Sequence, residues 1–220
     1  MDHLVKILDV QTLTHDVRRY IVEKPPHYDF VPGQATDVSI HLPEWEDKLR
    51  PFTFTCLPEH DYLEFMIKSY ADHDGVTHRL GNATPGLTLT LHDVFGAIHY
   101  TGPGVFFAGG AGITPFVSIF RDLDKRKQLT GNRLVYSNKT PADVVLDKEW
   151  QAMLGSNFIK LFTRENPRGH CQRIDARYLS ENITNVSQKF YICGPDEFVK
   201  NISDHLVHMG AAPEAVVFEK

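Results

Sequence analysis

Hydrophobic and polar residues alternate in short runs through the first hundred residues of the chain. Turn-forming sequences such as VPGQ and TPG separate these runs, and one short helix is expected around Gly75–Gly81. The runs are rich in β-branched and aromatic residues and cover 5–10, 18–24, 35–41, 51–56, 62–68 and 87–92. Short strands at this spacing predict an antiparallel β-barrel or a β-sandwich.

The pattern changes after about residue 101, where buried-type strands begin to alternate with amphipathic helices. Strands are expected over 104–110, 132–138, 158–165, 189–194 and 215–220, and helices over 114–127, 147–154, 175–183 and 195–210. This alternation predicts βαβ units and a parallel sheet covered on both faces. We place the domain boundary at Thr101–Gly104, which gives one domain over 1–101 and another over 102–220.

Composition narrows the possible functions by exclusion. The net charge of −5 argues against a general nucleic-acid binder. No run is apolar enough for a membrane span, and MDHLVKILDV lacks the features of a signal peptide, so we expect a cytoplasmic protein. Cys56, Cys171 and Cys193 lie too far apart for a zinc ribbon or an iron–sulfur cluster. His205 and His208 share a helical face without further ligands, so no metal is expected.

The loop AGGAGITPF follows the first strand of the second half. Gly110 and Gly112 let the backbone turn tightly, Thr114 suits a helix N-cap, and Pro115 suits the first helical position. A helix start of this kind attracts an anion. Proline replaces the third glycine of the usual dinucleotide fingerprint, and the next strand ends at Asn138 without an acid. A plain tight turn remains the alternative.

Two further stretches suggest chemistry. In YICGPDEF, Cys193 would end a strand before the turn at Gly194 and Pro195, although this motif alone favours a buried structural cysteine. In RPFTFTC, Pro51 forces Arg50 into an extended conformation.

Strand alternation within RPFTFTC puts Phe52, Phe54 and Cys56 on one face, and Thr53 and Thr55 on the other. A guanidinium, an aromatic face and a hydroxyl would together suit a flavin nucleotide. Taken alone, the stretch favours a solvated arginine.

Together these motifs resemble those of the ferredoxin–NADP⁺ reductase superfamily. The matching stretches, in order, are RPFTFTC, DGVTHRL, HDVFGAIHY, GGAGITPF and YICGPDEF. The similarity is greatest to the compact bacterial flavodoxin or ferredoxin reductases that lack an iron–sulfur domain. The resemblance implies a six-stranded antiparallel, FAD-binding β-barrel over 1–101, followed by a parallel-sheet α/β domain over 102–220 that binds NAD(P).

The resemblance also implies a set of flavin-binding residues. Arg50 would pair with the flavin phosphate, Phe52 would pack on the isoalloxazine, and Thr53 would hydrogen-bond near its N5. The other residues implied to contact the flavin or its pyrophosphate are Pro51, Ile67, Lys68, Gly75, Val76 and Thr77. FAD is expected rather than FMN, because the segment at Gly75 resembles one that cradles a pyrophosphate. Many relatives have tyrosine at the place of Phe52.

On the nicotinamide side, the resemblance implies that Thr114 lies between the two rings and Cys193 beside the nicotinamide. Gly110, Gly112, Pro115, Asn138, Gly194 and Pro195 would shape the same binding region. Phe218 could cover the flavin, with a plain final strand as the alternative, and Glu219 could be the charged group near the nicotinamide. Thr53, Cys193 and Glu219 are therefore the expected catalytic residues.

Coenzyme choice is expected to depend on Thr163, Arg164 and Arg173. In NADPH-using relatives, basic residues at such places hold the 2′-phosphate, and no acid ends the preceding strand. This pattern favours NADPH over NADH, with two solvated arginines as the alternative.

The implied activity is electron transfer from NAD(P)H through FAD to a small redox protein, flavodoxin or ferredoxin, by a monomeric enzyme. The alternatives are the reductase component of an oxygenase and a flavin-binding electron-transfer subunit of a larger complex.

Overall fold

A computed structural model describes residues 2–70, 74–96, 98–164 and 171–218 of the chain. Within it the chain folds as two compact units, which we describe separately. The first unit comprises Met1–His99 and Thr114–Asp122, and the second comprises Tyr100–Ile113 and Leu123–Lys220. Among the described residues, no helix has the length and apolar character that a membrane span requires.

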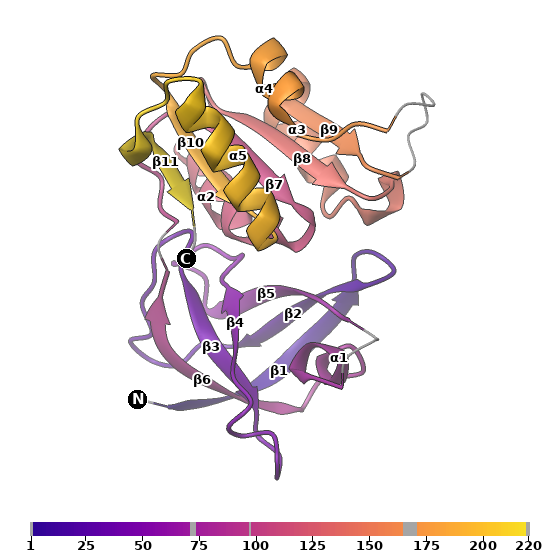
Figure 1. Cartoon of the computed structure of the whole chain (residues 1–220). Coiled ribbons are helices and arrows are strands. Elements are labelled where there is room, and N and C mark those ends of the chain that lie inside the picture. Colours follow the sequence, from indigo (N-terminus) through magenta and orange to yellow (C-terminus); the bar gives the residue numbers. More distant parts are fainter. Residues whose placement is uncertain (1, 71–73, 97, 165–170, 219–220) are drawn as a thin grey trace. The chain divides into compact units, whose positions relative to one another are not determined.

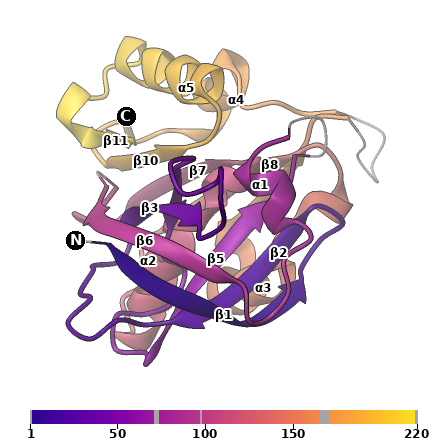
Figure 2. The ribbon, with the colours of Figure 1, turned by 90° about the horizontal axis from the view of Figure 1, so that it is seen from below.

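The first unit is built on a six-stranded antiparallel sheet with the strand order β4-β3-β6-β1-β2-β5 (Figures 1 and 2). Its strands are β1 (His3–Thr12), β2 (Val17–Glu23), β3 (Ala35–Ile40), β4 (Arg50–Thr53), β5 (Tyr62–Lys68) and β6 (Thr88–Phe95). The two outer strands approach each other, and an isolated antiparallel bridge joins Phe54 to Phe65. The sheet therefore closes on itself as a barrel, with the short helix α1 (Val76–Leu80) beside β5.

Alternation along the strands fills the barrel. On β1, Val5 and Ile7 are buried while Leu4 and Leu8 face outward. An aromatic cluster occupies the interior, where the Phe54 ring stacks on Phe30 with centroids 4.3 Å apart. The other buried residues come from the long strands, from α1 and from the loops between them, and the six-stranded barrel predicted from the resemblance is confirmed.

The predicted strand over 51–56 is too long. β4 ends at Thr53, and Phe54 takes part only in the isolated bridge. Beyond Thr53 the predicted alternation of faces does not separate buried from exposed residues, because Phe54, Thr55 and Cys56 are all fully buried. The Thr55 hydroxyl donates to the carboxylate of Glu64 at 2.8 Å, and this bond gives the buried hydroxyl a partner in the interior.

The second unit contains a five-stranded parallel sheet with the order β11-β10-β7-β8-β9 (Figure 1). Its strands are β7 (Gly104–Gly109), β8 (Arg133–Asn138), β9 (Phe158–Phe162), β10 (Lys189–Cys193) and β11 (Val216–Phe218). Its helices are α3 (Asp147–Leu154), α4 (Ala176–Asn182), α5 (Asp196–His208) and the short 3₁₀ helices η1 (Gly110–Ile113), η2 (Pro141–Asp143), η3 (Gly155–Asn157) and η4 (Pro213–Ala215). The predicted parallel α/β half is confirmed.

Both faces of this sheet are covered, as expected for near-continuous apolar strands. Val105 and Phe107 of β7 pack with residues of α4 and α5 on one face. Trp150 of α3 lies on the other side with Phe158 of β9, their ring centroids 6.4 Å apart. All six residues of β7 are buried, so this strand lies at the centre of the core.

The helix α2 (Thr114–Lys125) begins in the first unit and ends in the second. Its first two turns bond to the barrel: the Gly33 N–H donates to Ser118 Oγ at 3.1 Å, and Arg121 Nη1 donates to the Thr55 carbonyl at 2.8 Å. A side chain at Gly33 would collide with the Ile98 carbonyl, because its Cβ would lie 2.0 Å from that oxygen. These contacts explain why Thr114–Asp122 belongs with the barrel.

Candidate functional site

The strand β4 carries the expected phosphate and flavin residues. Arg50 and Pro51 are exposed, and Phe52 and Thr53 are half-buried. The Arg50 guanidinium donates to the neighbouring Leu49 carbonyl at 2.7 Å and is otherwise near the surface. The Phe52 ring lies against the barrel core, 6.4 Å from the Phe65 ring. β4 therefore offers a surface cation, an aromatic ring and a hydroxyl in succession.

The adjoining strand β5 contains Ile67 and Lys68, the next two residues expected to line the flavin, and their surroundings differ. Ile67 is 4% exposed and its side chain belongs to the barrel core, so only its backbone is available to a ligand. The ammonium of Lys68 binds the Asp16 carboxylate at 2.8 Å.

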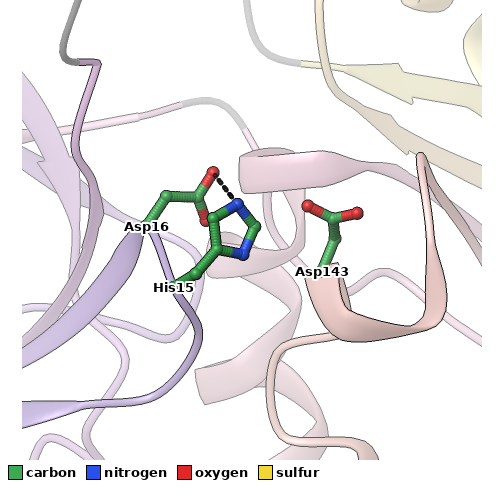
Figure 3. A group of neighbouring side chains, drawn as sticks. All are labelled: His15, Asp16 and Asp143. Carbon is green, nitrogen blue, oxygen red and sulfur yellow. Dashed lines mark ion pairs between the residues drawn. The ribbon is translucent and has the colours of Figure 1, made fainter.

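The turn between β1 and β2 brings His15 and Asp16 together (Figure 3), with Nε2 of His15 3.5 Å from Oδ2 of Asp16. Burial raises the pKa of Asp16, but the hydrogen bond and charge of Lys68 outweigh it and hold the pKa below its usual value. Asp143, also drawn there, belongs to the second unit, where it accepts hydrogen bonds from Thr140. The expectation that no metal takes part stays a prediction.

The start of α1 is the expected pyrophosphate cradle. Gly75 is the N-cap residue in an extended conformation, and a Cβ there would have no atom within 4 Å. The Val76 side chain is buried in the barrel core, and Thr77 is half-buried. No acidic residue lies in the first turn. Open space, backbone N–H groups and a hydroxyl at one helix start fit a phosphate chemically.

β5 brings these segments together, because β4 contacts it on one side and α1 also packs on it. The barrel unit also includes Thr114, the residue expected between the two rings. Apart from Phe218, which belongs to the second unit, the expected flavin residues of the described chain are thus gathered in a single unit. Their exposed guanidinium, half-buried aromatic ring and phosphate-type cradle fit a flavin nucleotide such as FAD.

In the second unit, the glycine-rich loop and the CGP loop meet at the carboxyl ends of the adjacent strands β7 and β10. A Cβ on Gly112 would lie 2.3 Å from the Cys193 carbonyl oxygen, and one on Gly109 would lie 3.2 Å from the Pro195 ring. Gly110 has a positive φ of 54°, and its carbonyl accepts from the Tyr136 hydroxyl at 3.1 Å. Only glycine allows this close approach.

The helix starts beside these loops differ slightly from expectation. η1 runs directly into α2, so Thr114 is the first helical residue rather than an N-cap, and Pro115 lies within the first turn. Pro195 is the N-cap of α5, and Asp196 opens the helix. Cys193 is buried at the end of β10, with 9% of its surface exposed. Its role beside a nicotinamide stays a prediction.

A cleft of about 490 Å³ opens where β8 and β9 end, beside α5. Its lining residues are Ser137, Thr163, Arg173, Ile174, Asp175, Pro195, Glu197, Phe198, Asn201 and His205. Two of the three expected coenzyme residues, Thr163 and Arg173, therefore share one cleft. Arg164 is exposed beyond the end of β9 and is not part of this lining.

Asn138 lies deeper, with 5% of its surface exposed, and its carbonyl accepts from the Thr163 backbone N–H at 2.9 Å.

Sequence reasoning missed the polar residues that α5 and the start of α4 contribute to this cleft. Glu197, Asn201 and His205 recur at intervals of four residues, which puts them on one face of a helix. Asp175 is the N-cap of α4 and accepts from the Tyr178 N–H at 2.8 Å. In the sequence, the spacing of four residues between these side chains was the one sign that they share a helical face. The cleft thus contains two carboxylates as well as the Arg173 guanidinium.

Phe218 is a strand residue. It pairs with Ile192 across β10 and β11 and packs against the core of the second unit, half-buried. The expectation for Glu219 lies outside the described residues.

Comparison with known proteins identifies the fold. Residues 106–204 match the family described as "Oxidoreductase NAD-binding domain". The chain is 24% identical over 221 residues to the ferredoxin–NAD(P)⁺ reductase component of the naphthalene 1,2-dioxygenase system of Pseudomonas putida. That alignment covers 96% of this chain but only 66% of the relative's length.

Two solved structures share the fold over the whole chain. A ferredoxin NADP⁺ reductase from Neisseria gonorrhoeae with bound FAD and NADP has a TM-score of 0.83 and 24% identity, covering 99% of this chain and 98% of its own. The flavohem-like FAD/NAD binding domain of nitric oxide dioxygenase from Vibrio cholerae O1 biovar El Tor has a TM-score of 0.85 and 19% identity, covering 100% and 98%. The matched domain, the aligned relative and the shared two-domain fold confirm the resemblance of the motifs to those of the ferredoxin–NADP⁺ reductase superfamily, and the fold of the chain is that of these reductases.

Proposed function

We propose that the chain is a flavoprotein reductase that takes hydride from NAD(P)H and passes electrons to a small carrier protein. The contact between the Gly112 loop and the Cys193 loop carries this proposal, because it brings the two loops together at the carboxyl ends of β7 and β10, the edge of a parallel sheet where nucleotides bind. The NAD-binding domain that residues 106–204 match and the flavin-type residues gathered in the barrel unit support it. The division into a FAD-binding half (1–101) and an NAD(P)-binding half (102–220), a monomeric state and a cytoplasmic location are part of the same proposal.

Bound FAD would supply the chemistry that accepts hydride and releases single electrons. The Arg50 guanidinium would pair with its phosphate, and the N–H groups at Gly75, Val76 and Thr77 would hold the pyrophosphate. Phe52 would pack on the ring, Thr53 would donate to its edge, and the backbone near Ile67 and Lys68 would line it. No general acid or base is required, because hydride transfer depends on bringing two rings within about 3–3.5 Å of each other.

The crevice residues would orient the nicotinamide. Thr114 would lie between the two rings, Cys193 would lie against the nicotinamide, and Gly194 and Pro195 would shape the pocket. The cleft beside α5 would take the adenosine half of the coenzyme, where Arg173, with Thr163 and the nearby Arg164, would favour the 2′-phosphate of NADPH. Asp175 and Glu197 line the same cleft and oppose a phosphate, so the preference depends on the arginines.

The acceptor is proposed to be a flavodoxin or a ferredoxin. A second candidate function, the reductase component of an oxygenase, is favoured by the Pseudomonas putida relative, which is such a component. Both candidates require the same hydride step, and they differ only in what oxidises the flavin.

Purification of the chain with added FAD tests the function. The protein should be yellow, and mixing it with NADPH or NADH in a stopped-flow spectrophotometer should bleach the flavin absorbance. Reoxidation by ferredoxin and by flavodoxin would then identify the carrier. A colourless protein that cannot be reconstituted with FAD or FMN would contradict the proposal.

Coenzyme choice is tested with Arg164→Ala and Arg173→Ala. Loss of a phosphate contact should weaken NADPH binding by roughly ten- to hundredfold, since a hydrogen bond to a charged group contributes about 1.5–3 kcal/mol. NADH binding should change little. Arg177→Ala is the matched control, because Arg177 is exposed on α4 and pairs with Glu181 at 2.8 Å. Equal losses for both coenzymes would refute the assignment.

A further inference from the structure

A buried carboxylate on β5 joins three segments of the barrel unit. Glu64 is 3% exposed, and its Oε1 lies 2.6 Å from Arg121 Nη1 and 2.8 Å from the Thr55 hydroxyl. Its Oε2 lies 3.8 Å from Arg19 Nη1. We call these four residues the Glu64 cluster.

One donor atom takes part in two of the hydrogen bonds within the cluster. Arg121 Nη1 also donates to the Thr55 carbonyl at 2.8 Å, so a single nitrogen holds both the β5 side chain and the backbone that follows β4. A carboxylate buried to this extent requires such partners, since an unpaired buried charge is strongly unfavourable. The middle of α2 is therefore held against β5 and the segment after β4 by a charge-assisted contact.

Three members of the cluster lie on the same segments as residues of the proposed flavin site. Thr55 is two residues after Thr53, and Glu64 is three residues before Ile67. Arg121 lies two turns along α2 from Thr114, on a stretch that Ser118 also bonds to Gly33. The cluster thus connects the two strands expected to hold the flavin with the helix that carries Thr114.

We propose that the Glu64 cluster is a positioning device for hydride transfer: it sets the place of Thr114 relative to Thr53 and β5. The proposal rests on the proposed function. Apolar residues of similar volume often replace a buried ion pair without loss of stability, so stability alone does not require these charges. Transfer between stacked rings, in contrast, depends on distances to within about 1 Å.

The test compares the flavin-loaded wild type with Glu64→Gln, Arg121→Met and the double variant Glu64→Leu/Arg121→Met. The double variant leaves no buried charge unpaired between the two positions, and so keeps the experiment informative if a single variant unfolds. Glu181→Gln on the exposed face of α4 is the matched control, because it breaks an ion pair that lies outside the cluster. Stopped-flow reduction at varied NADPH and NADH gives a limiting rate and an apparent Kd.

In the double variant we expect FAD to remain bound, the limiting rate to fall by roughly ten- to hundredfold and the apparent Kd to stay within about twofold. A second readout uses the protein without coenzyme: amide hydrogen exchange should become faster in Thr114–Asp122 and at 53–56, but not in β10. Glu181→Gln should match the wild type in both measurements.

A folded, flavin-loaded double variant with the wild-type limiting rate, or with unchanged exchange in α2, would overturn the positioning role alone. A wild-type protein that binds FAD but is reduced by neither coenzyme would overturn the proposed function, and this role with it.

Discussion

Gly112 lies so close to Cys193 that a Cβ at position 112 would stand 2.3 Å from the Cys193 carbonyl oxygen. Backbone therefore meets backbone between the two loops, without space for a side chain.

Gly112→Ala should lower the free energy of unfolding by about 1–3 kcal/mol, because the backbone must move to relieve the overlap. It should also weaken NAD(P)H binding. Gly75→Ala is the control for stability, since no atom lies within 4 Å of its built Cβ and its φ is −128°. That substitution should change the free energy of unfolding by less than about 1 kcal/mol, because the lower N-cap preference of alanine offsets the entropic gain from replacing glycine. Urea unfolding measures the free energy of unfolding of both variants. Equal losses in Gly112→Ala and Gly75→Ala would contradict the packing argument.

Cys193→Ala should slow hydride transfer while FAD stays bound. The residue ends β10 beside the Gly112 loop, and a displaced nicotinamide could cost roughly tenfold or more in rate. Stopped-flow bleaching of the flavin measures the rate, and the absorbance spectrum measures flavin content. Cys193→Ser keeps the size of the side chain and separates packing from polarity. An unchanged rate with lower stability would make Cys193 a structural residue.

The stabilising contribution of the Asp16 carboxylate should be lost in acid. Its pKa is held below the usual value in the folded state by Lys68, despite partial burial. The carboxylate therefore contributes stability above about pH 4, its unfolded pKa, and that contribution is lost as pH falls through the folded pKa. Urea unfolding between pH 3 and 6 should show a shallower decline in Asp16→Asn. Lys68→Met should weaken the pH dependence of the free energy of unfolding in the same way. If both variants lose stability with falling pH as steeply as the wild type, the Asp16–Lys68 ion pair is not the cause.

Tyr20 fastens the end of α1 to the barrel. Its hydroxyl donates to the Leu80 carbonyl at 2.6 Å, and burial raises the pKa of Tyr20 to about 12. Tyr20→Phe should cost about 1–3 kcal/mol in the free energy of unfolding, since a buried carbonyl loses its donor.

Ionisation gives a second test of Tyr20. Because its folded pKa is raised, its contribution is present below about pH 10 and lost as pH rises towards 12. Tyr70→Phe, at a 45% exposed site, should stay within about 0.5 kcal/mol. Equal effects of the two substitutions would contradict this account.

Period and turn chemistry predicted the parallel α/β half and the strands of the first half, because each element has a local pattern. They left a barrel and a sandwich open for the first half, and the resemblance of the motifs decided for the barrel. β5 and α3, for example, span the residues that their alternation and amphipathic spacing predict. The burial of Thr55 could not be predicted, since its partners Glu64 and Arg121 are 9 and 66 residues away. Hydrogen bonds between residues so far apart leave no periodic pattern in the sequence.

The candidate site was predictable where a motif required backbone geometry. Gly112 and the CGP loop meet as their strand ends predict. The acidic side of the cleft was missed, because Asp175 lies in no motif and the CGP motif gives no role to Glu197, although Glu197 lies in the same stretch. Ile67 was expected to line a ligand, yet its side chain belongs to the barrel core. Motifs therefore located the backbone of the site better than its side-chain lining.

The membership of Thr114–Asp122 in the barrel unit matters for protein engineering. A chimaera joined near residue 101 would take Ser118 and Arg121 from the donor half, and Glu64 and Gly33 would then depend on foreign partners. Module exchange between such proteins should transplant this helical stretch together with the barrel, or use a donor whose first helix has arginine at the same place.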